Sequence, residues 1–103
     1  MIIDFEVDKL IILGIDPGLA TIGFGVIESN GVNNRMIDYG ILTTPPKIPL
    51  PTRLKSVYEQ VRDLLNKYKP DCIAIEELFF NTNVTTAINV AHARGAILTS
   101  AIC

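Results

Sequence analysis

Two acidic residues stand where apolar, strand-like segments of the sequence end. Asp16 closes "KLIILGID" (residues 9–16), and Glu76 lies near the end of "DCIAIEE" (residues 71–77). If the two carboxylates meet, they repel each other unless a cation or a proton lies between them. Carboxylate oxygens suit a hard divalent ion such as Mg²⁺ or Mn²⁺. Phosphodiester hydrolysis uses such ions to ready a water molecule and to steady the leaving oxygen.

Each carboxylate also has an ordinary structural interpretation. Asp16 precedes a Pro-Gly pair, and an aspartate at that place commonly caps a turn. Glu76 can be a solvated charge at the end of a strand, and Glu77 is an equal candidate on that view. Alternation favours Glu76, because it falls on the face opposite Ile73 and Ile75.

The surrounding pattern predicts the elements that position these residues. Strands are expected over residues 9–16, 20–28 and 35–44, joined by a Pro-Gly turn and by an Asn- and Gly-rich hairpin at 29–34, which makes a three-stranded antiparallel meander. A helix with one apolar stripe begins near Pro51 or Thr52 and is stopped by Pro70. A right-handed crossover then lays strand 71–77 parallel to strand 9–16. Asp16 and Glu76 would share the carboxyl edge of two neighbouring strands, where open α/β sheets hold ligands.

The last segment, residues 84–103, is predicted to be a helix that is apolar on two sides. Ala87, Ala91 and Gly95 are small residues spaced by four, which lets another backbone approach closely. Two apolar sides predict burial against the sheet and against something else. A central core helix and a subunit interface both satisfy this pattern.

Composition limits the class of protein. The 103 residues are 49% hydrophobic and 19% charged, which predicts one folded domain over residues 9–103. Residues 1–8 are expected to be a short leader or an extra edge strand. The formal net charge of −2 is not typical of a protein that binds nucleic acid through a basic surface. Cys72 and Cys103 lack metal-ligand spacing and are expected to be buried free thiols. With neither a signal peptide nor a membrane-length apolar run in this sequence, a cytoplasmic location with no membrane contact is the default expectation.

Four segments together resemble one family. "ILGIDPGLATIGFGVIE", "LPTRLKSVYEQV", "PDCIAIEELFF" and "ARG" occur in the order and spacing of the RuvC family of Holliday-junction resolvases. The resemblance runs from about Leu10 to Cys103. It implies an α/β, ribonuclease-H-like fold and a Mg²⁺-dependent endonuclease, with Mn²⁺ as a substitute, that cuts four-way DNA junctions in recombination and repair.

The resemblance also assigns residues. Asp16 and Glu76 match the family's first and second catalytic, metal-binding carboxylates. Phe79 matches an aromatic that inserts near the exchange point of the junction, where stacking on a base contributes about 1–3 kcal/mol; Phe79 can equally plug the core. Arg94 falls on the "ARG" motif, and both DNA contact and helix packing are open for it. Helix 84–103 matches the family's homodimer interface, and a branch-migration helicase is the implied partner.

This chain also departs from the family pattern. The family fold continues with a fifth strand and further helices, which carry two more metal-binding aspartates and much of the basic surface. Here no acidic residue follows Glu77, and the sequence stops at Cys103 in mid-pattern. We therefore expect a piece of a longer protein that binds metal feebly, cleaves junctions little, and leaves strand 71–77 as an exposed edge.

Other classes compete with this interpretation. Actin-like nucleotide-binding domains also open with strand-Asp-x-Gly-turn-strand, but no second glycine-rich loop appears here. The YqgF group of resolvase-like ribonucleases lacks a glutamate at the "AIEE" position. A non-catalytic module for dimerisation or for binding DNA structures is the third alternative.

Overall fold

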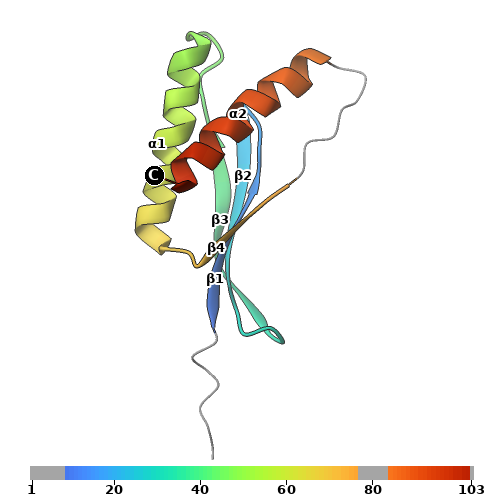
Figure 1. Ribbon diagram of the computed structural model, residues 1–103, viewed down its shortest axis with the longest axis vertical. Helices are drawn as coiled ribbons and strands as arrows, with labels where there is room; N and C mark the ends of the chain where they lie inside the picture. Colours follow the sequence, from blue (N-terminus) through green and yellow to red (C-terminus); the bar gives the residue numbers. More distant parts are fainter. Residues whose placement is uncertain (1–8, 77–83, 103) are drawn as a thin grey trace, which may run out of the picture.

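The computed structural model describes residues 9–76 and 84–102, which form one sheet and two helices (Figure 1). The elements are β1 (Leu10–Asp16), β2 (Thr21–Ser29), β3 (Asn34–Thr43), α1 (Leu50–Tyr68), β4 (Cys72–Ile75) and α2 (Val84–Ile102). Their order along the chain is the order predicted from the sequence. Neither described helix is long and apolar enough to cross a membrane.

The sheet has the order β3-β2-β1-β4. β1 pairs antiparallel with β2, β2 pairs antiparallel with β3, and β4 runs parallel to β1. The predicted meander and the predicted parallel crossover are both confirmed. Within the described residues, β3 and β4 form the two edges of the sheet.

The core lies between one face of the sheet and the two helices. Its buried members from the strands alternate along β1 and β2, as a half-covered sheet requires. They are Leu13, Ile15, Ile22 and Val26, and they pack with Val57, Val61 and Leu64 of α1 and with Ala93 and Ile97 of α2. Full burial of such a side chain contributes about 1.5–3 kcal/mol. The opposite face of the sheet leaves Tyr39 and Ile41 of β3 largely exposed.

The ends of α1 follow from its prolines. The helix begins at Leu50, one or two residues earlier than predicted, with Pro49 at the N-cap. Proline suits this first turn because the first backbone N–H groups of a helix have no partner within it. At the other end, Lys69 adopts the left-handed conformation (φ 47°), and its N–H donates to the carbonyl of Leu65 at 2.9 Å. Pro70 then prevents continuation.

One of the two apolar sides predicted for α2 is buried within the described chain. Ala93 and Ile97 are fully buried, whereas Ile88 is 50% exposed and Leu98 is 41% exposed. One side of α2 closes the core against α1 and the sheet. The other side, which carries Ile88 and Leu98, faces solvent in the single chain, so its burial against a partner stays a prediction.

The expectation of a buried thiol is wrong for Cys72, which is an exposed free cysteine. Its neighbour Ile73 points into the core, so alternation along β4 turns Cys72 to the uncovered face of the sheet. Cys103 lies outside the described residues.

Candidate metal-binding active site

The carboxyl ends of β1 and β4 bring Asp16 and Glu76 together. The parallel pairing runs up to Ile15 beside Ile75, and the N–H of Glu76 then donates to the carbonyl of Ile15 at 3.1 Å. Ile15 and Ile75 pack into the core, so the next residue of each strand faces the opposite, uncovered side. Both carboxylates are exposed there.

The two carboxyl groups lie close enough to influence each other's protonation. A hydrogen bond between the Asp16 and Glu76 side chains raises the pKa of Glu76, and the negative charge of Asp16 raises it further. Two carboxylates this close repel each other unless a proton or a cation lies between them. A divalent cation can take the place of that proton, and hard oxygen ligands are what Mg²⁺ or Mn²⁺ prefers. The donor set therefore fits a metal ion at this edge.

An unexpected contact supports the register between β1 and β4 that places Glu76 beside Asp16. The N–H of Asp71 donates to the carbonyl of Ile11 at 2.7 Å, and the N–H of Ile11 donates to Oδ2 of Asp71, also at 2.7 Å. This reciprocal pair ties the residue before β4 to the second residue of β1. The role of Asp71 was not predicted, because strand topology indicates which strands pair but not which side chain bonds to a neighbouring backbone group.

The turn after Asp16 is tight. A Cβ atom built on Gly18 would lie 2.2 Å from the backbone oxygen of Thr21, so only glycine fits. The hydroxyl of Thr44 donates to the carbonyl of Leu19 at 2.6 Å, and the Thr44 N–H donates to the carbonyl of Ala20 at 3.2 Å. Thr44, the residue after β3, therefore clamps the loop that leaves the carboxylate edge.

The other predicted site residues do not join this pair in the described chain. Phe79 and Glu77 lie outside the described residues. Arg94 lies on α2, partly buried, and its Nε atom is buried without a hydrogen-bond partner among the described residues. His92, for which no role is predicted, is exposed. The part of the chain that the structure describes holds no cluster of three or more metal-ligand side chains.

The raised pKa of Glu76 predicts a pH-dependent stability in the absence of metal. Glu76 binds a proton more tightly in the folded protein than in the unfolded chain. The repulsion between Asp16 and Glu76 therefore lowers the free energy of unfolding when the pH is above the raised pKa. That cost disappears as the pH falls below the ordinary value of 4.5. Asp16→Asn removes the repulsion. With a chelator present, it should melt above the wild type at pH 7, and the two curves should converge at about pH 4. A lower melting temperature for Asp16→Asn at pH 7 would contradict the geometry.

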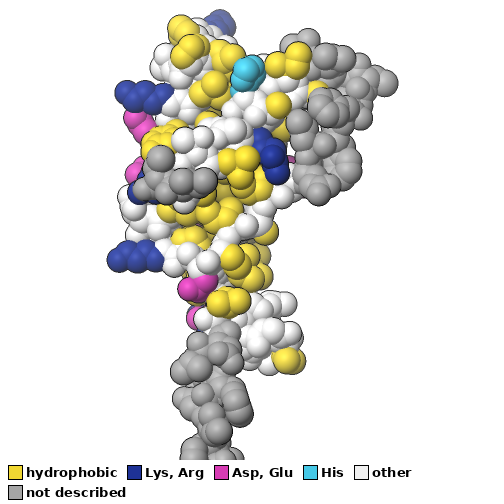
Figure 2. Space-filling model, in the orientation of Figure 1, with side chains coloured by type: hydrophobic (Ala, Val, Ile, Leu, Met, Phe, Trp, Pro, Cys, Tyr) yellow, Lys and Arg dark blue, Asp and Glu magenta, His cyan; other side chains and the backbone are white. Residues whose placement is uncertain are grey.

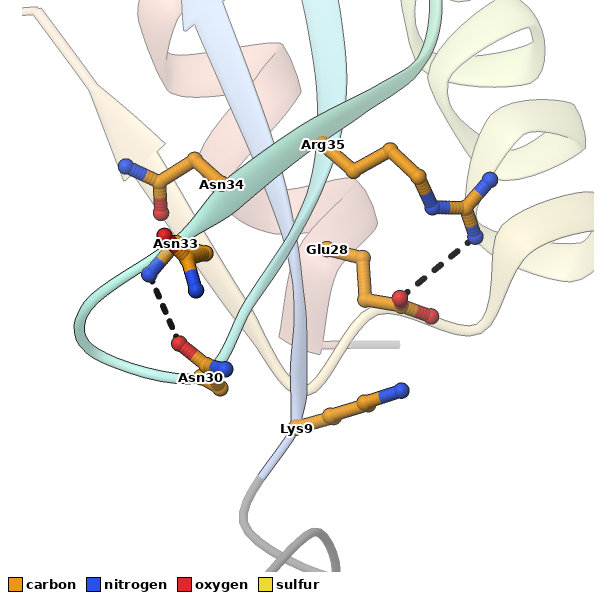
Figure 3. A pocket seen from close by; sticks show the side chains of 6 residues that line it. All are labelled: Lys9, Glu28, Asn30, Asn33, Asn34 and Arg35. Carbon is orange, nitrogen blue, oxygen red and sulfur yellow. Dashed lines mark hydrogen bonds and ion pairs between the residues drawn. The ribbon is translucent and has the colours of Figure 1, made fainter.

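A separate hollow of about 250 Å³ lies beside the β2–β3 hairpin (Figure 3). Its lining includes Lys9, and Arg35 forms an exposed ion pair with Glu28 at 3.4 Å. The side-chain oxygen of Asn30 accepts backbone N–H groups of the hairpin and is therefore committed to the turn. This hollow is at the start of β1, about 20 Å along the strand from Asp16, so it forms no part of the carboxylate site.

The family is decided by the match along the chain. Residues 12–103 match the family described as crossover junction endodeoxyribonuclease RuvC. The chain belongs to the RuvC family. Curated RuvC proteins of Alkaliphilus oremlandii and Desulforamulus reducens are 52% and 53% identical over 89% and 86% of this chain. The matched region is 56% and 55% of those proteins, so the chain spans about half the length of the relatives it matches.

Solved structures of RuvC proteins have the same fold as this chain. The structure of Thermus thermophilus RuvC superposes with a TM-score of 0.78 at 31% identity. T. thermophilus RuvC in complex with a Holliday junction substrate superposes with a TM-score of 0.80 at 29% identity. In that complex the match covers 90% of this chain and 58% of the other. The expected ribonuclease-H-like fold is confirmed, and the actin-like alternative is set aside.

Proposed function

We propose that this chain carries the first half of the active site of a Mg²⁺-dependent endonuclease that resolves four-way DNA junctions. The observation that carries the proposal is the placement of Asp16 and Glu76 side by side at the carboxyl edge of β1 and β4. Membership in the RuvC family supports it, as does the likeness to a RuvC bound to a Holliday junction. Because the proposed substrate is DNA, we propose that the protein acts in the cytoplasm. The proposed processes are recombination and repair.

In this proposal Asp16 and Glu76 hold the metal. The cation, when bound, supplies the charge that readies a water molecule and steadies the leaving oxygen. Asp16 raises the pKa of Glu76, so a cation bound by both carboxylates would also relieve the repulsion between them. The neighbouring strand leaves room: Gly23 lies opposite Asp16, and a Cβ atom built on Gly25 would meet nothing within 4 Å. A DNA backbone can thus approach the uncovered face beside the carboxylates.

Two carboxylates give Mg²⁺ only part of its octahedral set of oxygen ligands. Weak metal binding and slow cleavage by the 103-residue chain therefore remain our prediction. For the two family positions outside the carboxylate pair, we propose that Phe79 stacks on a base near the exchange point. We further propose that Arg94, on α2, faces the DNA backbone.

The direct test compares a labelled four-way junction with a linear duplex of the same sequence. Binding is measured with Ca²⁺ in place of Mg²⁺, and nicking is measured with Mg²⁺ at low salt. We expect junction binding at least about tenfold tighter than duplex binding, together with slow nicking that Asp16→Asn and chelation both abolish. Equal binding to both DNAs would contradict the proposed substrate. Tight junction binding with no nicking at any Mg²⁺ concentration would favour the non-catalytic module.

We also propose that the protein is a homodimer through α2. The exposed side of this helix presents Ile88 and Leu98 with the small residues Ala91 and Gly95 between them. Figure 2 shows hydrophobic side chains gathered over the middle of the face that α2 crosses. A two-fold dimer would offer two carboxylate sites to the two strands of like polarity in a four-way junction. A branch-migration helicase remains the proposed partner of the assembled enzyme.

A charge on this side of α2 should separate the subunits. Leu98→Asp would bury an unpaired carboxylate at the interface, so we expect its dimer dissociation constant to rise at least about 30-fold. Val32→Asp is the matched control, because Val32 is an apolar residue of the hairpin that is 85% exposed. Sedimentation velocity over a concentration series measures both. The same mass for Leu98→Asp and the control at every concentration would exclude α2 as the interface.

A further inference from the structure

A second small hollow lies next to the carboxylate edge, on the side of the helices. Its volume is about 220 Å³, and it is lined by Leu19 and Ala20 of the loop after β1, Arg53 of α1, and Asn89 and Val90 of α2. Figure 1 shows that α1 begins at the end of the molecule where β1 ends, and that the first half of α2 lies at the same end. By chain reach, Leu19 is at most about 11 Å from Asp16.

Among the described residues, the Arg53 side chain is held in this hollow through one nitrogen, Nε. Its Nε donates to the hydroxyl oxygen of Thr44 at 3.0 Å, and that hydroxyl in turn donates to the carbonyl of Leu19 at 2.6 Å. Thr44 is 4% exposed, so the anchor is buried away from solvent. The terminal amino groups of Arg53 form no hydrogen bond or ion pair with the described part of the chain. The guanidinium is therefore oriented in advance and has donors to spare.

The residues that line the hollow indicate which chemical group it could bind. Arg53 supplies the charge and Asn89 an amide, and none of the described residues that line the hollow is acidic. The remaining lining is apolar, from Leu19, Ala20 and Val90. A phosphodiester group with its sugar matches this mixture, because its oxygens suit a guanidinium fork and its deoxyribose suits an apolar wall. The volume is below that of a pocket for a drug-sized molecule, so one backbone unit fits better than a larger ligand.

We infer that this hollow is a subsite for a backbone phosphate of the DNA strand that reaches the Asp16–Glu76 edge. The inference rests on the proposed function, since the strand is that of the junction. Arg53 is then a positioning residue: it holds the strand through a phosphate near the scissile one and does not touch the reacting atoms. Through Thr44, the same guanidinium links the bound phosphate to the loop that leaves Asp16.

A purely structural Arg53, which only braces the loop, is the rival explanation. Asn89→Asp separates the two, because it places a negative charge in the hollow without touching the anchor to Thr44. The matched control is Asn66→Asp, the same change at an exposed position near the end of α1. Arg53→Gln removes the charge itself.

The experiment measures junction binding by fluorescence anisotropy with Ca²⁺ at several salt concentrations, beside thermal melting of each variant. We expect Asn89→Asp and Arg53→Gln to raise the dissociation constant about tenfold relative to Asn66→Asp. Arg53→Gln should also reduce the slope of log affinity against log salt by about one for each DNA phosphate that the variant no longer neutralises. Asn89→Asp should melt like the control.

Two results would overturn the inference. One is Asn89→Asp binding the junction as tightly as Asn66→Asp. The other is Arg53→Gln melting lower than the wild type with an unchanged salt slope, which would make Arg53 a brace only. In both cases the wild type still binds the junction, so the proposed function stands. If the wild type shows no junction binding, the proposed function falls and this subsite falls with it.

Discussion

Asp16→Asn is expected to lower the affinity of the protein for Mn²⁺ by at least about 100-fold. Loss of a group that only supports a metal ligand already costs about 10–100-fold in metal affinity, and Asp16 is proposed as a ligand itself. An asparagine keeps the size of the side chain and one oxygen but removes the negative charge. Glu76→Gln should have an effect of similar size, because the two carboxylates share one cation.

Isothermal titration with Mn²⁺ or electron paramagnetic resonance of free Mn²⁺ measures this effect at neutral pH. The matched control is Asp63→Asn, which removes an exposed carboxylate from α1. It should bind Mn²⁺ as the wild type does. Equal losses for Asp63→Asn and Asp16→Asn would mean that the ion is attracted by net charge alone, and the shared metal site would be wrong.

Gly18→Ala is expected to destabilise the protein by about 3 kcal/mol, toward the upper end of what single substitutions usually do. The new Cβ atom would lie 2.2 Å from the backbone oxygen of Thr21, and neither atom is the end of a flexible side chain. The loop must therefore open. Because this loop begins directly after Asp16, the same substitution should weaken Mn²⁺ binding in the molecules that remain folded.

Gly25→Ala is the matched control for Gly18→Ala. Gly25 lies in β2, where an added Cβ atom meets nothing within 4 Å. Urea denaturation should show a change of less than about 1 kcal/mol for Gly25→Ala, since glycine is no better than alanine within a strand. If both variants unfold at the same urea concentration, the turn at Gly18 has room for a side chain and is not tight.

The sequence predicted the sheet because its signals are local. Alternation in β4 placed Glu76 on the face opposite Ile73 and Ile75, and the Pro-Gly pair ended β1 at Asp16. Short connections and the handedness of the crossover then allowed only one arrangement of four strands. The meeting of two carboxylates sixty residues apart followed from that topology.

What the sequence did not predict depends on contacts between distant elements. The pairing of Asp71 with Ile11 and the clamp of Thr44 on the loop after β1 join side chains to backbone groups far along the chain. Such contacts leave no periodic signal. The helix α2 shows the same limit: its composition allowed two buried sides, but the described elements cover only the side of Ala93 and Ile97.

Anomalous diffraction from crystals grown with Mn²⁺ tests the central claim most directly. The account predicts one strong peak between Asp16 and Glu76, with an oxygen of each carboxylate at about 2.0–2.2 Å from the ion, by analogy with the similarly coordinated Mg²⁺. The peak should be missing in crystals of Asp16→Asn. Manganese peaks elsewhere on the protein, with none at this edge, would contradict the shared metal site.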